Sequence, residues 1–397
     1  MPFLIAIFAS FILYGLAGSL FSSVWPEIAR ELSVDFTLLG LLIMISSGAS
    51  GITSSFAYKI RRKLGTSIST TISLTGFIIG LLLLYFSKNL AMICIALAII
   101  GSSNGIIDTI VNSYMIKAYG GGKISMLHAS WGLGSSVGPI IMSYALAHTS
   151  SYKNGFIWVI GAILIIGICF ILLKIYWEGK KKSLPEDFVN RHSVSKEEKE
   201  SHIDLKDIFK IKLGFVFVLC FILCGSTNSA ISNWIATLSV EQRGITVAEG
   251  ATAAAFYFGG LTAVRVILGF ISDRIKTKYI LIFGLVVSII GYSLMFIRNT
   301  SLPFTYFVAT IVGIGISPLV PFLHHSIKEL FNEKYIGVIV SCCNTTSLIG
   351  GAAATALMSL VIKVVGVNTA PILFLALMIL ALIIYMHIIK VKEKEGV

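Results

Sequence analysis

Long apolar runs alternate with short polar segments along the whole chain. A helix needs about 20 mainly apolar residues to cross a bilayer, because each of its backbone amides must be hydrogen-bonded within the segment itself. Runs of this kind predict an all-α integral membrane protein with twelve transmembrane helices. They cover approximately 3–26, 36–58, 65–87, 90–116, 124–148, 155–177, 213–238, 249–272, 279–297, 302–327, 335–362 and 367–389.

A charged segment over 178–212 separates the first six runs from the last six. It predicts an N-terminal six-helix bundle over 1–177, a cytoplasmic linker over 178–212, and a C-terminal six-helix bundle with a short cytoplasmic tail over 213–397. Shifting the second half back by about 210 residues aligns several landmarks, among them Gly15 with Gly225 and Gly40 with Gly250. Two such repeats predict pseudo-symmetric bundles, with a solute site at their interface near the bilayer midplane.

Composition excludes a water-soluble protein, since 56% of the residues are hydrophobic, 13% are charged and the mean hydropathy is +0.90. The net charge of +12 raises nucleic acid as a partner, but the basic residues lie between apolar runs and form no single stripe. Of the 31 Lys and Arg residues, 24 fall in loops that share one side if the N-terminus is cytoplasmic. This bias predicts a multi-pass protein of the cytoplasmic (plasma) membrane with both termini in the cytoplasm, whose partner is the lipid bilayer.

The sequence offers no sign of catalytic or cofactor chemistry. Its six cysteines lie inside apolar stretches without metal-ligand spacing, and neither a phosphate-binding loop nor a Ser/His/Asp arrangement is present. We therefore expect no enzyme activity, no metal site and no cofactor apart from a coupling ion.

Two ionisable residues, Asp108 and Arg265, lie well inside predicted spans, where charge is costly and needs a reason. Asp108 is nine residues before Lys117, or about 13 Å from the inner surface at 1.5 Å per residue. Asn104, Asp108 and Asn112 are spaced i, i+4, i+8 and form one polar stripe, which predicts that they face a wet cavity.

The next span places His128, Trp131 and Ser135 on one face. Amides and carboxylates exchange hydrogen bonds with sugar hydroxyls, and an indole packs on the apolar side of a sugar ring. The second half adds Asn228, Asn233 and Trp234 in the seventh span and Asn344 in the eleventh as further predicted solute contacts.

Three short motifs lie in the fourth, fifth and eighth predicted spans. They are Gly105-Ile-Ile-Asp108-Thr109-Ile-Val-Asn112, Trp131-Gly132-Leu133-Gly134 followed by Gly138-Pro139, and Arg265-Val-Ile-Leu-Gly269-Phe-Ile-Ser-Asp273-Arg274. These motifs resemble those of the major facilitator superfamily, and the closer likeness is to fucose-permease-like sugar:proton symporters, including bacterial glucose/mannose:proton symporters. Asn228 departs from that group, which commonly shows a glutamate about six residues before the tryptophan, so one expected proton carrier is missing.

The resemblance implies a secondary active transporter that moves a small polar solute, above all a monosaccharide, by alternating access in symport with protons. Asp108 is the expected proton carrier, because closing a site over an ionised aspartate costs more than closing it over a protonated one; a permanently paired, structural acid is the alternative. The resemblance also implies that Arg265, Asp273 and Arg274 form a gate-locking charge network. We expect the carrier to function as a monomer.

The rival function is a proton-coupled drug or metabolite efflux antiporter. Its support is Gly134 with Gly138-Pro139, a partial match to the antiporter motif of the fifth span, although Ile140 and Ile141 stand where that motif has a glycine pair.

Overall fold

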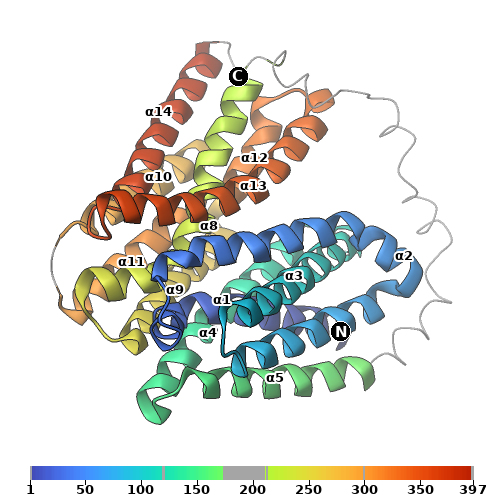
Figure 1. Ribbon diagram of the computed structural model, residues 1–397. Coiled ribbons are helices and arrows are strands. Elements are labelled where there is room, and N and C mark those ends of the chain that lie inside the picture. Colours follow the sequence, from blue (N-terminus) through green and yellow to red (C-terminus); the bar gives the residue numbers. More distant parts are fainter. Residues whose placement is uncertain (1, 119–120, 173–210, 212, 298–299, 395–397) are drawn as a thin grey trace.

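The computed structural model describes residues 2–118, 121–172, 211, 213–297 and 300–394 (Figure 1). Nearly all of these residues are helical, and no strand occurs among them, as the apolar pattern predicts. The elements are α1 Pro2–Glu31, η1 Phe36–Leu38, α2 Leu39–Tyr85, α3 Leu90–Ala118, α4 Gly121–Thr149, α5 Tyr152–Leu172, α8 Gly214–Arg243, α9 Val247–Ile271, η5 Ser272–Arg274, α10 Thr277–Leu294, α11 Leu302–Ile316, α12 Leu319–Leu330, α13 Glu333–Val365 and α14 Ile372–Lys394.

Ten segments of the described chain are long and apolar enough to cross a membrane, and each coincides with a predicted span. The other two predicted spans are also helices. In α5 the apolar segment Tyr152–Ile168 is shorter, and α4 is rich in glycine and serine, which lowers its hydropathy. The structure thus confirms the predicted all-α membrane fold.

Two elements differ from the predicted boundaries. The second and third spans belong to one 47-residue helix, α2, whose ribbon turns back on itself between them in Figure 1. The stretch 59–64 contains neither proline nor glycine, and lysine and arginine favour helix, so nothing in it ends the helix. The tenth span is instead divided into α11 and α12 at Ser317 and Pro318, because proline lacks the amide hydrogen that would continue the helix.

Most helices pack against partners from the same half of the chain: α1 against α4, α2 against α3, and α8 against α13. Between the halves, α4 packs against α9 and α2 packs against α13. The repeat offset of about 210 residues converts one of these pairs into the other, since it carries the first half of α2 onto α9 and α4 onto α13. The pairing therefore has the approximate two-fold relation expected of repeats. Of the predicted linker 178–212 only residue 211 is described, and the domain boundaries stay a prediction.

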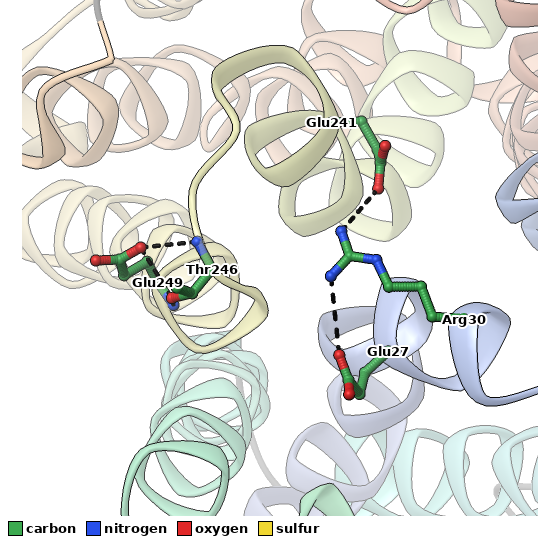
Figure 2. Close-up of polar contacts among 5 residues, drawn as sticks. All are labelled: Glu27, Arg30, Glu241, Thr246 and Glu249. Atoms are coloured by element: carbon green, nitrogen blue, oxygen red, sulfur yellow. Dashed lines mark hydrogen bonds and ion pairs between the residues drawn. The ribbon is translucent and has the colours of Figure 1, made fainter. Parts of the chain in front are cut away.

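We call the face where α1, α4, α8 and α13 end the predicted outer face, after the orientation that the basic residues indicate. There Arg30 at the end of α1 lies between Glu27, one turn earlier, and Glu241 of α8, at 3.9 and 3.5 Å (Figure 2). Beside this cluster α9 begins with a capping box, in which Thr246 and Glu249 exchange hydrogen bonds (Figure 2). Arg30 is thus an ion-pair link between the halves.

Candidate functional site

A cavity of about 250 Å³ lies between the two halves of the chain. Six helices contribute to its wall: α1, α2, α3 and α4 from the first half, and α8 and α9 from the second. The position matches the interface site that the repeat predicts. Its polar wall residues are Tyr14, Ser19, Ser22, Ser46, Ser47, Ser50, Asn104, Ser135, Ser229, Ser232 and Asn233, and its aromatic ones are Tyr14, Phe21, Trp131 and Phe258.

The polar stripe of α3 lies at this cavity. Asn104 is in the wall, and its side-chain oxygen Oδ1 is buried without a hydrogen-bond partner among the described residues. An unpaired buried acceptor costs free energy, so this amide is suited to a hydroxyl donor from a solute. Asp108 and Asn112 follow on the next two turns, outside the wall, where Asn112 Nδ2 donates to Asp108 Oδ1 at 2.9 Å.

Asp108 has no salt-bridge partner among the described side chains. The phenol of Tyr14 lies within electrostatic range of it, but that group carries no positive charge at neutral pH. A structural acid that only holds the helix in place stays the alternative, since Asp108 is hydrogen-bonded to Asn112 of its own helix. Asp108 is a partly buried acid that accepts a hydrogen bond from an amide, one helical turn from the cavity wall.

The α4 residues are divided between the cavity and its surroundings. Trp131 and Ser135 are in the wall, and Ser135 Oγ also donates to the carbonyl oxygen of Gly15 at 3.3 Å. His128 is outside the wall, with its ring edge-on to Phe11 at a centroid distance of 6.2 Å. The predicted shared face is present, but only its outer part meets the cavity.

Of the two asparagines predicted as solute contacts on α8, one lines the cavity and the other does not. Asn233 is in the wall, and its Nδ2 donates to the carbonyl oxygen of Ser229 at 2.9 Å. Asn228 accepts a 3.4 Å hydrogen bond from the Tyr257 hydroxyl and is not in the wall.

Two further predicted solute contacts are not part of the described site. Trp234 is fully buried, and its Nε1 donates to the Thr355 carbonyl oxygen at 3.0 Å. The predicted solute contact of Trp234 therefore does not fit its position, because its indole is packed between helices. Asn344 is on α13, and its side chain lies outside the described residues.

Of the expected gate residues Arg265, Asp273 and Arg274, the structure places the two described side chains, Arg265 and Arg274, in different surroundings. The guanidinium of Arg265 lies over the ring of Trp131, with its Cζ atom 5.8 Å from the ring centroid. Arg274 is exposed in the 3-10 turn η5 that follows α9, and the side chain of Asp273 lies outside the described residues. A charge network among the three stays a prediction.

Sequence reasoning missed Tyr14 and most of the serines that line the cavity. Serine and tyrosine hydroxyls are common in membrane helices, so they do not stand out as an aspartate does. A usable signal was present in α2, where Ser46, Ser47 and Ser50 cluster within five residues of an otherwise apolar run.

Packing accounts for the glycines of α4. A Cβ atom at Gly134 would overlap the carbonyl oxygen of Ile12 on α1, and one at Gly138 would lie 2.9 Å from the Leu16 carbonyl oxygen. These glycines let α1 and α4 approach closely. Their resemblance to an antiporter motif therefore requires no functional explanation.

Comparison with known proteins agrees with this architecture. The family model of the Major Facilitator Superfamily matches residues 7–276 and again 217–397. Among curated proteins, the chain is similar to the glucose/mannose transporter GlcP of Bacillus subtilis (strain 168), with 21% identity over 293 residues that cover 71% of this chain and 68% of that protein.

Proposed function

The chain belongs to the major facilitator superfamily and is a multi-pass membrane transport protein; from that premise we propose that it carries a hexose across the cytoplasmic membrane in symport with protons. In this proposal it acts as a monomer by alternating access, with both termini in the cytoplasm. The observation that carries the proposal is the cavity between the halves, whose wall combines hydroxyls, two amides and an indole.

The size and chemistry of the cavity favour a monosaccharide. Its 250 Å³ is below the range of about 300–1,000 Å³ typical of sites for drug-sized ligands. Serine hydroxyls and asparagine amides both donate and accept, as sugar hydroxyls do, and aromatic side chains suit the apolar face of the sugar ring. The named relative, a glucose/mannose transporter, makes glucose and mannose the first solutes to test.

Asp108 is the proposed proton carrier. An ionised carboxylate buried without a cationic partner is costly, whereas the protonated acid is not. Loading a proton therefore lowers the free energy of closing the helices over this region. Because Asp108 is one turn from the solute-lining Asn104, proton loading and solute binding act on the same part of α3.

Efflux antiport is the alternative proposal, and it rests on the partial motif of the fifth predicted span. The glycines that suggested it pack α4 against α1. The cavity is also small for the bulky solutes that drug exporters carry.

The proposal is tested with purified protein in proteoliposomes, using radiolabelled glucose, mannose, a nucleoside and a cationic dye, each with and without an imposed proton gradient. We expect glucose or mannose to accumulate when the gradient is directed into the lumen. Accumulation of the dye against the direction of proton flow, with no hexose transport, would establish the antiporter instead.

A wall glycine provides a variant that fills the cavity without disturbing the packing. Gly18 lines the cavity, and nothing lies within 4 Å of a Cβ atom placed there. Gly18→Leu should abolish hexose uptake, since its side chain enters the proposed solute volume. Gly161→Leu, at a position on α5 that is equally open, is the matched control and should transport normally.

A further inference from the structure

Trp131 is held by groups from both halves of the protein. Its indole lines the cavity from α4, and the ring of Tyr14 on α1 lies 6.4 Å away between centroids. From α9, Phe258 meets it nearly edge-on at 6.3 Å and 85°, and Arg265 covers it at 5.8 Å. Two of these three neighbours thus belong to the opposite half.

Arg265 is a cation that lies over this ring. Its Nε is buried without a hydrogen-bond partner among the described residues, and no described carboxylate lies within salt-bridge distance. A guanidinium in the membrane interior needs a compensating interaction, and the electron-rich face of an indole supplies one. The Arg265–Trp131 contact therefore has two effects: it stabilises the cation, and it holds the indole ring in place.

We propose that Arg265 is a positioning residue for the solute: it holds the Trp131 indole at the cavity wall and makes hexose affinity depend on the contact between α4 and α9. This inference rests on the proposed function, and it differs from the gate-locking role that the family resemblance implies. The solute touches Trp131, and Arg265 acts through that ring without touching the solute. Binding is then strongest when the two halves are in contact at this level of the membrane.

A double-mutant cycle separates this role from a merely structural one. Equilibrium binding of radiolabelled glucose and mannose is measured in detergent for the wild type, Arg265→Leu, Trp131→Leu and the double variant. Each single change should weaken affinity by roughly ten-fold, the size expected for loss of a desolvated cation–π contact. The double variant should be no weaker than the weaker single one, because both changes remove the same interaction. Arg265→Lys, which retains the cation, should recover part of the affinity.

Arg243 provides a matched control. It is also a buried arginine over an aromatic ring, with its Cζ 5.2 Å from the Phe304 centroid, but it is outside the wall of the cavity. Arg243→Leu should leave hexose affinity unchanged. Fold losses that multiply in the double variant of the cycle, or an equal loss in Arg243→Leu, would overturn the positioning role.

Tryptophan fluorescence tests the contact without any solute. Arg265→Leu should change the emission spectrum of the full-length protein, and the same substitution in a Trp131→Phe background should not. If no hexose binds the wild type but this spectral dependence holds, the proposed function fails and the positioning of Trp131 stands. If a hexose binds and the spectral change persists without Trp131, the positioning role is rejected while the proposed function stands.

Discussion

The two ends of the interface between the halves are held together very differently. At the predicted outer face, Arg30 pairs with Glu241, and the hydroxyls of Ser143 and Thr252 share a 2.7 Å hydrogen bond between α4 and α9. Farther toward the inner side, the halves meet through the contact between Arg265 and Trp131. The structure therefore represents a conformation closed on the predicted outer side.

Close backbone approach strengthens the outer end further. A Cβ atom at Gly40 on α2 would lie 2.7 Å from the Thr355 carbonyl oxygen and would overlap the Ser359 hydroxyl, both on α13. In the proposed alternating access, outward opening would break the contacts described at this end. In the proposed mechanism the outer contacts oppose outward opening, while the inner region contains the acid proposed to couple opening to protons.

The largest expected effect concerns the acid on the inner side. Asp108→Asn should abolish accumulation driven by a proton gradient and leave solute exchange, because the amide cannot take up the proton. Uptake against a concentration gradient and counterflow exchange are measured side by side in proteoliposomes. Asp108→Glu, which retains a carboxyl group, is the control and should keep gradient-driven accumulation. Full accumulation by Asp108→Asn would reject the coupling role.

The next effect concerns the tight packing at the outer end. Gly40→Val should separate α2 from α13 and favour the outward-open form by about 1–3 kcal/mol, the usual cost of overpacking. The measurement is labelling of a Ser22→Cys reporter in the cavity by a membrane-impermeant thiol reagent added from outside. Gly48→Val, two turns along the same helix with open space around it, should leave labelling unchanged. Equal labelling in both variants would show that this approach does not control opening.

A smaller effect is expected from the ion pair between the halves. Arg30→Gln removes the link to Glu241, and because both side chains are partly exposed, the loss should be about 0.2–1 kcal/mol. The same reporter should label faster, and added salt should reduce the difference between wild type and variant. Lys153→Gln breaks a comparable pair with Glu31 inside one half and should have no such effect. An equal increase in labelling rate in Lys153→Gln would show that the effect comes from general destabilisation and not from the link between the halves.

The smallest effect is expected at Asp35, in the turn before η1. The backbone amide of Thr37 donates to its carboxylate at 2.8 Å and is the main reason that the pKa of Asp35 lies below its usual range, with a smaller contribution from Lys363 of the opposite half. Because the folded-state pKa is lowered, its stabilisation is complete above about pH 4, the ordinary value for aspartate, and is lost as the pH falls through the lowered pKa. Asp35→Asn should therefore increase reporter labelling slightly at pH 7. A difference that grows on acidification would contradict this assignment.

Much of the fold could be predicted, because a membrane-spanning helix has a strong sequence signal of about 20 apolar residues. The break in the tenth span follows from Pro318, because the effect of proline on a helix is local. The continuity of α2 could not be predicted in this way. The sequence of its basic stretch is compatible with either a loop or a helix, and tertiary packing decides between them.

The candidate site was only partly predictable. Asn104, Trp131 and Asn233 were found because polar or aromatic residues at helical spacing indicate a shared face. Trp234 follows the same pattern but points into the protein interior, because the rotation of a helix depends on close contacts that one sequence does not display. Tyr14 escaped notice because its hydroxyl does not stand out in a membrane helix as an aspartate does.

Proton movement during solute uptake tests the central claim most directly. Glucose or mannose, whichever is transported, is added outside proteoliposomes that contain a pH-sensitive dye, with no gradient imposed and the membrane potential clamped. The account predicts that the lumen acidifies as the hexose enters, and that Asp108→Asn abolishes this acidification. Hexose entry at the full rate with no change in luminal pH would contradict it.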